Sequence, residues 1–243
     1  MSRIFRAAGH ENTAPRTETG ARRTRNPMIA AAIVALLCAA TVVVISINYE
    51  RKAAVPAAAP VPAADVPGLL VRENSHRLGT AAPDAVTLVE FLDFECEACA
   101  AAFPLVEDLR TKYAGRVNFV VRYFPIPSHF NAERAARAVE AAAAQGAFEG
   151  MYKAMYRNQA RWGEQRVAKD AEFRVFAQEL GLDIARWEAD YNDPATLERV
   201  RQDFEDGRAL GVRGTPTFFL DGVQLRPSSA DEFIGAIDAA LAE

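Results

Sequence analysis

Cysteine and histidine, the usual ligands of structural zinc, are scarce in this sequence. Its 243 residues include three cysteines and three histidines, and no two histidines have the paired spacing of metal ligands. A structural zinc site needs four ligands, usually Cys or His, so this scarcity argues against zinc. The six residues are Cys38, Cys96, Cys99, His10, His76 and His129.

Charge is absent from the twenty-residue run 28–47. At about 1.5 Å per residue, a helix of this length spans about 30 Å, the thickness of a bilayer core. A cleaved signal peptide is the alternative, but its apolar core usually runs about 7–15 residues. Arginines dominate the preceding segment, so we expect an uncleaved, single-pass membrane anchor with a cytoplasmic N-terminus and an extracytoplasmic body.

Positive charge is in deficit after residue 27. Residues 1–27 carry six Arg against two Glu, a net charge of +4, while the whole chain carries −4. The remaining residues therefore carry −8, which argues against nucleic acid as a partner. The first segment is polar and has no apolar period, so we expect a disordered tail over 1–27.

Proline and alanine dominate the segment that follows the apolar run. Residues 53–67 hold four prolines in fifteen positions. In polyproline II geometry, at roughly 3.1 Å per residue, such a segment reaches about 45 Å. We therefore predict a linker over 48–67 and one folded body over 68–243.

Two short apolar runs in this body, 87–94 and 117–125, are rich in β-branched or aromatic residues. This composition favours buried strands. A helix over about 97–113 would join them into a βαβ unit with parallel strands.

The C-terminal part of the body predicts two strands and a helix. Residues 217–220 form the first strand, and an Asp-Gly turn signal leads to the second over 223–225. The pair Ser229 and Glu232 has the spacing of a capping box and predicts the start of the last helix.

A long helical stretch over about 127–210 separates these two sheet-forming parts. Asn131 is a candidate N-cap for the Ala-rich helix that follows it. Trp162 and Trp187 are expected to be core anchors of the helical part rather than ligand-stacking residues.

The pair Cys96 and Cys99 lies where the first strand gives way to a helix. The first thiol then lies among the unpaired backbone N–H groups of the helix N-terminus, which stabilise a thiolate. A disulfide closing so short a loop would restrict the unfolded chain very little, so a structural role is the weaker interpretation. The pair therefore predicts thiol–disulfide exchange, which suits an oxidising, extracytoplasmic space.

Four local patterns together resemble the DsbA-like branch of the thioredoxin superfamily. They are Phe-Glu-Cys-Glu-Ala-Cys after a strand, Glu90 six residues before Cys96, Pro104 eight residues after it, and Gly-Thr-Pro-Thr-Phe-Phe over 214–219. The run Pro-Ser-His-Phe-Asn-Ala over 127–132 also resembles DsbA-like sequences. The resemblance implies an α/β thioredoxin fold with a helical insertion, preceded here by a transmembrane helix and a Pro/Ala-rich linker.

The resemblance also implies roles for single residues. Glu90 matches the buried acidic residue, where it would hold a proton near Cys99, although a glutamate on a polar face is the alternative. The bond Thr215–Pro216 matches a cis-proline that faces Cys96 and leaves backbone groups free to pair with a substrate peptide. An ordinary trans proline at a strand start is the alternative there. His129 is not counted as catalytic.

The dipeptide between the cysteines departs from the family pattern. Strongly oxidising members commonly carry a histidine directly before the second cysteine, where this chain has Ala98. Glu95 and Glu97 add negative charge, which disfavours a thiolate, and both carboxylates are expected to be exposed and screened by salt, so the effect should be moderate. We therefore expect a reduction potential between about −120 mV, the value of DsbA, and about −270 mV, that of thioredoxin.

These observations predict a protein disulfide oxidoreductase that introduces or exchanges disulfides in reduced or unfolded exported proteins. Cys96 would be the attacking and attacked sulfur and Cys99 the resolving one. No cofactor is expected, and the resemblance implies reoxidation by a membrane quinone-linked thiol oxidase. Two alternatives stay open: a reductase or isomerase fed with cytoplasmic electrons, and a tethered chaperone-like binding module.

Overall fold

The computed structural model describes residues 66–243. The predicted tail over 1–27, the predicted anchor over 28–47 and nearly all of the predicted linker over 48–67 lie outside the described residues. None of the helices within 66–243 is long and apolar enough to cross a bilayer.

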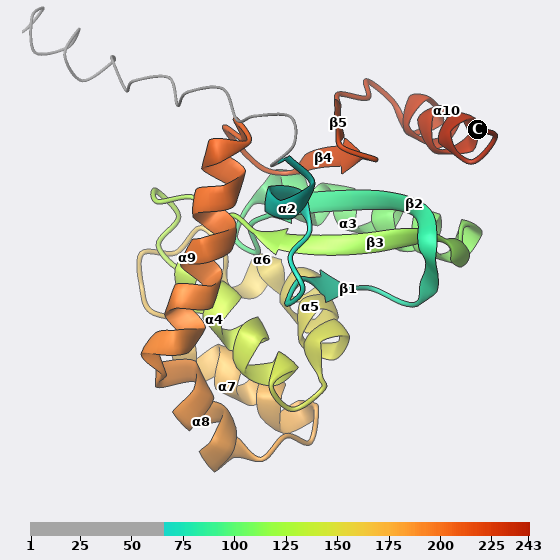
Figure 1. The fold of residues 1–243 in the computed structure, drawn as a ribbon. Coiled ribbons are helices and arrows are strands. Elements are labelled where there is room, and N and C mark those ends of the chain that lie inside the picture. The colour runs from blue at the N-terminus through green and yellow to red at the C-terminus, as the bar shows by residue number, and fades with distance from the viewer. Residues whose placement is uncertain (1–65) are drawn as a thin grey trace, which may run out of the picture. The chain divides into compact units, whose positions relative to one another are not determined.

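The described part consists of strands and helices in the order of a thioredoxin fold with an insertion (Figure 1). The strands are β1 (His76–Arg77), β2 (Ala81–Leu92), β3 (Gly115–Tyr123), β4 (Thr217–Leu220) and β5 (Val223–Leu225). The helices are α2 (Val66–Leu70), α3 (Glu97–Lys112), α4 (Ala132–Ala143), α5 (Phe148–Arg157), α6 (Gln159–Trp162), α7 (Asp170–Glu179), α8 (Ile184–Asn192), α9 (Pro194–Ala209) and α10 (Ala230–Ala240).

Five strands form one mixed sheet in the order β1–β3–β2–β4–β5. β2 and β3 pair in parallel and are joined by α3, which is the predicted βαβ unit. β4 pairs antiparallel with β2 and with β5, and α10 follows them, as predicted for the second unit. The antiparallel edge strand β1 was not predicted, since its two residues are too few to show a period.

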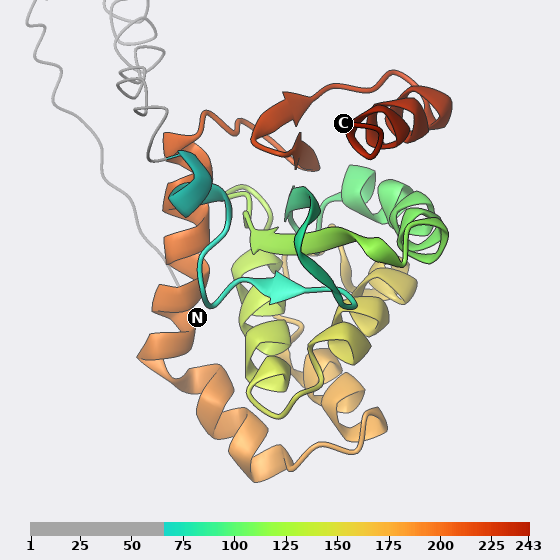
Figure 2. The ribbon, with the colours of Figure 1, turned by 45° about the vertical axis from the view of Figure 1, so that its right-hand side comes forward.

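The alternation of side chains along β2 assigns them to two apolar layers. Leu88 and Leu92 pack in the layer that includes residues of α3 and α10. Val89 and Phe91 pack in a smaller layer with residues of α2 and α9. Figures 1 and 2 show the same division, with α2 and α9 over one face of the sheet and α3 and α10 over the other. Glu90 shares the face of Leu88 and Leu92, so its carboxyl group enters the larger apolar layer.

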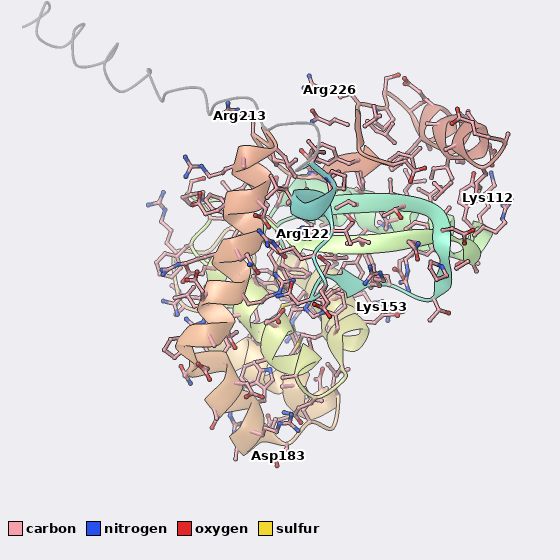
Figure 3. All side chains as sticks on the ribbon, viewed as in Figure 1. Lys112, Arg122, Lys153, Asp183, Arg213 and Arg226 are labelled. Atoms are coloured by element: carbon pink, nitrogen blue, oxygen red, sulfur yellow. The ribbon has the colours of Figure 1, made fainter. Side chains whose placement is uncertain are left out.

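A buried arginine ties β3 to the helices over the smaller layer. Arg122 is fully buried, and its guanidinium donates to Asp203 at 2.7 Å and to Asp206 at 2.6 Å, both on α9. It also donates to the carbonyls of Leu69 and Leu70, at 2.6 and 2.8 Å, at the end of α2. Figure 3 shows Arg122 at the junction of these elements. A buried charge needs such full pairing, because an unpartnered one is strongly destabilising.

Six helices, α4 to α9, form the insertion between β3 and β4. Trp162 and Trp187 are almost completely buried in it, as predicted for core anchors. Their indole N–H groups donate to the carbonyls of Met155 at 3.2 Å and Ala138 at 3.1 Å, so the polar end of each ring is also satisfied.

Asn131 precedes α4 as predicted, but its side chain does not cap this helix. Its Nδ2 donates to the carbonyls of Gln165 and Val167, at 2.9 and 3.1 Å, and its Oδ1 accepts the Lys169 N–H at 3.1 Å. The expected capping role is therefore wrong. The Asn131 side chain instead holds the loop before α7. The Glu95 carboxylate accepts the N–H of Asn131 at the start of α4.

The predicted capping box at α10 is confirmed on one side. The Ser229 hydroxyl accepts the Glu232 N–H at 3.1 Å. The Glu232 carboxylate does not return to Ser229, because it accepts the N–H and the hydroxyl of Ser228, each at 2.7 Å.

Candidate functional site

Cys96 is the N-cap residue of α3, directly after the turn that ends β2. Its N–H donates to the Asp93 carbonyl at 3.2 Å, and its own carbonyl accepts the Ala100 N–H at 3.1 Å. Cys99 lies in the first turn of the helix. Both cysteines are free thiols, with exposed fractions of 8 % for Cys96 and 1 % for Cys99. Cys96 is therefore the sulfur that another molecule can reach more easily.

The surroundings of Cys96 favour its thiolate. Its pKa is lowered to about 5, chiefly by a hydrogen bond from the Cys99 thiol, with a smaller contribution from Thr215. The backbone N–H groups of Ala98 and Cys99 also lower this pKa, although the sulfur makes no capping hydrogen bond of ordinary geometry. Desolvation opposes these effects but does not outweigh them. At neutral pH the Cys96 sulfur is a thiolate, which is the nucleophilic form.

Cys99 and Glu90 form the buried half of the site. Burial raises the pKa of the Cys99 thiol well above its usual value, and the hydrogen bond to Cys96 and the Glu90 charge add to this. Burial also raises the pKa of Glu90 to about 8, with a smaller contribution from Glu107. Glu90 is only 5 % exposed, so the alternative of a glutamate on a polar face is wrong. A carboxyl group with this pKa exchanges its proton near neutral pH, close to Cys99.

The loop before β4 lies against the Cys96 sulfur. The Thr215–Pro216 peptide bond is cis, so the alternative of an ordinary trans proline is wrong. The Cys96 sulfur lies 3.4 Å from the Thr215 carbonyl oxygen, which accepts a hydrogen bond from it only when the thiol is protonated. The Thr217 hydroxyl donates to the Gly214 carbonyl at 2.7 Å and closes the loop. The structure thus brings all the candidate site residues together, while their catalytic roles stay predictions.

An ion pair beside the cysteines was missed by the sequence analysis. Asp93 is 2 % exposed, and its Oδ2 lies 2.7 Å from Nδ1 of His129 and accepts the Ile126 N–H at 2.9 Å. Its Oδ1 accepts the Glu95 N–H at 2.8 Å. The hydrogen bond with Asp93 raises the pKa of His129 to about 9, so the imidazole is protonated at neutral pH. The two residues are 36 positions apart, and no local spacing connects them.

Glu95 does not occupy the exposed position that the sequence suggested. It is 1 % exposed, and its Oε2 accepts the Asn131 N–H at 2.5 Å, at the start of α4. Burial raises the pKa of this carboxyl group. The expectation that Glu95 places a solvent-screened negative charge beside Cys96 is therefore wrong. Hydrogen bonds, rather than the charges of the neighbouring glutamates, dominate the pKa of Cys96.

Two side chains of the insertion hold the carbonyls of the turn before α3. The buried amide of Gln159, at the start of α6, donates to the carbonyl of Phe94 at 2.7 Å and to that of Cys96 at 2.9 Å. The Tyr156 hydroxyl donates to the Asp93 carbonyl at 3.4 Å. The insertion therefore holds the backbone that carries Cys96, a role that no local sequence pattern indicates.

A dithiol at a helix N-cap, a buried carboxyl group behind it and a cis-proline loop in front of it define a thiol–disulfide exchange site on a thioredoxin fold. The family model described as thioredoxin matches residues 72–239. The chain belongs to the thioredoxin family, which confirms the fold that the sequence predicted.

Solved structures with this fold include a thioredoxin-like oxidoreductase and DsbA proteins. A thioredoxin-like oxidoreductase from Silicibacter pomeroyi DSS-3 is 27 % identical, with a TM-score of 0.61, over 74 % of this chain and 98 % of that one. α-DsbA1 from Wolbachia pipientis has a TM-score of 0.65 at 19 % identity, over 73 % and 96 % of the two chains. BdbD from Bacillus subtilis has a TM-score of 0.62 at 19 % identity, over 70 % and 94 %. At 19 % identity, the last two demonstrate a shared fold.

The curated relatives are longer proteins, and this chain matches only a part of each. The Na⁺/H⁺ antiporter NhaA of Herminiimonas arsenicoxydans is 41 % identical over 144 residues, which are 59 % of this chain and 22 % of the antiporter. NhaA 1 of Mycobacterium sp. strain KMS is 35 % identical over 174 residues, 69 % of this chain and 27 % of that protein. The chain therefore matches about a quarter of the length of these relatives.

Proposed function

We propose that the chain is a membrane-tethered, extracytoplasmic thiol–disulfide oxidoreductase that introduces disulfides into reduced exported proteins. The observation that carries this proposal is the asymmetry of the pair. Cys96 is the more accessible thiol and has a lowered pKa, whereas Cys99 is buried and has a raised one. A structural disulfide gains nothing from such an asymmetry, while an exchange reaction needs a leaving sulfur that is stable as a thiolate.

The reaction would begin with the oxidised Cys96–Cys99 pair. A substrate thiolate attacks the Cys96 sulfur, the intramolecular S–S bond breaks, and Cys99 leaves with the electron pair and takes up a proton, for which Glu90 is the nearby donor. A second substrate thiolate then attacks the substrate sulfur of the mixed disulfide and releases the Cys96 thiolate. The substrate dithiol has lost two electrons, and the enzyme dithiol has gained them.

The lowered pKa of Cys96 favours oxidation of the substrate as the net direction. A stable thiolate stabilises the reduced enzyme and makes its disulfide a stronger oxidant. A value of about 5 lies between the roughly 3.5 of DsbA and the roughly 7 of thioredoxin, which supports the intermediate potential expected from the sequence. Turnover then requires an external electron acceptor, for which we propose a membrane quinone-linked thiol oxidase.

A trapping experiment with the full chain tests the proposed function. Cys99→Ser leaves Cys96 able to form a mixed disulfide but removes the sulfur that resolves it. Incubation with reduced, unfolded ribonuclease A and an oxidant should accumulate a covalent complex that reductant dissolves. The matched controls are Cys96→Ser, which should trap nothing, and Cys38→Ser, which should behave as the wild type does. Trapping by Cys96→Ser instead would reverse the assigned roles, and catalysed reduction without any oxidation would indicate a reductase.

The proposed location has its own test. The uncharged run 28–47 follows an Arg-rich segment, so a phosphatase reporter fused after residue 67 should be active outside the cytoplasm. The protein should also stay with membranes after alkaline washing. A soluble product that starts near residue 60 would contradict the anchor and indicate a cleaved signal peptide.

A further inference from the structure

The dipeptide between the cysteines contains no cation, yet the fold brings one to the site. Residues 97 and 98 are Glu and Ala. His129, which lies between β3 and α4, forms an ion pair with Asp93, 2.7 Å from Nδ1 to the carboxylate. Asp93 itself lies three residues before Cys96. The helical insertion thus supplies a positive charge from outside the Cys-x-x-Cys motif.

The connection between this ion pair and Cys96 is a single hydrogen-bonded turn. The Cys96 N–H donates to the Asp93 carbonyl, which closes a turn over residues 93–96 and keeps its end Cα atoms within about 7 Å of each other. The Asp93 carboxylate folds back on the same turn through the Glu95 N–H. His129 therefore bonds directly to the segment that positions the sulfur.

Asp93 would disfavour the Cys96 thiolate if its charge were uncompensated. Asp93 is buried and belongs to the same hydrogen-bonded turn as Cys96, so its carboxylate is a like charge in a poorly solvated environment. Protonated His129 neutralises it, and the remaining groups whose charges act on His129 are Cys96, Glu164 and Glu95. Among these, the thiolate is the group that changes charge in the redox cycle.

We propose that His129, held by Asp93, is the cation that stabilises the Cys96 thiolate and thereby raises the reduction potential of the Cys96–Cys99 pair. The coupling is reciprocal, because one interaction free energy acts on both titrating groups. The Cys96 charge raises the pKa of His129, so the His129 charge must favour the thiolate equally. His129 acts through space and through Asp93, and no step of the exchange uses it as an acid or a base.

This inference rests on the proposed function and is tested by the potential rather than by activity alone. The full chain is equilibrated with glutathione buffers, and the redox state of the pair is read by alkylation and mass. His129→Gln should lower the equilibrium ratio of reduced to oxidised enzyme, at a fixed glutathione buffer and pH 7, about tenfold, which is a decrease in potential of about 30 mV. His129→Arg keeps a cation beside Asp93 and should retain the wild-type potential.

The matched control is His76→Gln. His76 is also partly buried and also bonds a carboxylate, with 2.6 Å between its Nε2 and Glu140, but it lies on β1 away from the cysteines. Its substitution should leave the potential unchanged. An effect of His76→Gln equal to that of His129→Gln would indicate a general loss of structure and overturn the specific role.

The unmodified chain provides a second measurement that does not depend on any variant folding. An NMR titration of the histidine ring protons should give His129 a pKa about one unit higher in the reduced protein than in the oxidised one. Equal values in the two redox states, or a wild-type potential in His129→Gln, would overturn the inference. Failure of the proposed function looks different, because the wild-type pair would then either not exchange with glutathione or have a potential at or below about −270 mV, whatever the effect of His129→Gln.

Discussion

Glu90→Gln should make the folded protein more stable, and increasingly so as the pH rises. The Glu90 carboxyl group has an ordinary pKa of 4.5 and a folded-state pKa of about 8, because burial disfavours its charge. Between these two values the folded state binds more protons than the unfolded state, so stability falls with rising pH. Glutamine has the shape of the protonated group and never ionises, so the variant avoids this loss.

The magnitude follows from the two pKa values. At pH 4 the carboxyl group is mostly protonated in both states, and the variant should differ little from the wild type. The carboxyl group ionises more readily in the unfolded state, and this lowers the free energy of unfolding of the wild type by about 3 kcal/mol at pH 7 and by about 5 kcal/mol at pH 9. The variant should therefore gain about 3 kcal/mol at pH 7, or a rise in melting temperature of about 10 °C.

Urea unfolding of the reduced full chain at pH 4, 7 and 9 measures this difference. The control is Glu97→Gln, an exposed glutamate on the first turn of α3, which should show no gain that grows with pH. A Glu90→Gln effect of equal size at all three pH values would refute the titration argument. The same variant should resolve mixed disulfides more slowly at pH 7, since Cys99 loses its nearby proton donor and acceptor.

Three further substitutions test how the fold supports the site. Gln159→Leu removes the amide that donates to the Phe94 and Cys96 carbonyls. The Cys96 carbonyl keeps the Ala100 N–H, but the Phe94 carbonyl loses its donor, so urea unfolding should show a loss of about 1–3 kcal/mol together with slower exchange. Gly207→Ala places a Cβ 2.7 Å from a ring carbon of Phe124 and should cost about 1–3 kcal/mol in the same assay. Gly235→Ala, in an open position of α10, should instead stabilise the protein by about 0.5–1 kcal/mol, and a loss there would contradict the clash argument.

The sheet and the helices of the thioredoxin halves were predictable because their signals are local. β4 and β5 have the predicted bounds, and α3 ends one residue from its predicted end. β2 begins at Ala81 rather than Thr87, where an irregular register between Ala81 and Val86 hides the period of two. The helices of the insertion were indicated only as one stretch, because their packing partners come from distant parts of the chain.

The same distinction explains which parts of the site were found. Cys96, Cys99 and the Thr215–Pro216 bond belong to short motifs, so their sequence context was sufficient. His129 and Gln159 act through contacts with the turn before α3, more than 30 positions away, and no spacing in the sequence reports such a contact. The local sequence does not show burial either. Glu95, beside Cys96, was therefore expected to be an exposed charge, but its side chain is buried.

The thioredoxin halves and the helical insertion contribute different groups to the site. The thioredoxin halves supply both sulfurs and the loop against them, whereas the insertion supplies the bonds to the turn through Tyr156 and Gln159 and the cation of His129. The turn carries the sulfur, so changes in the insertion act on the thiolate without altering the motif itself. The reduction potential of this protein should therefore depend on how the insertion packs on the turn as well as on the hydrogen bonds within the thioredoxin halves, so the residues between the cysteines are insufficient to predict it.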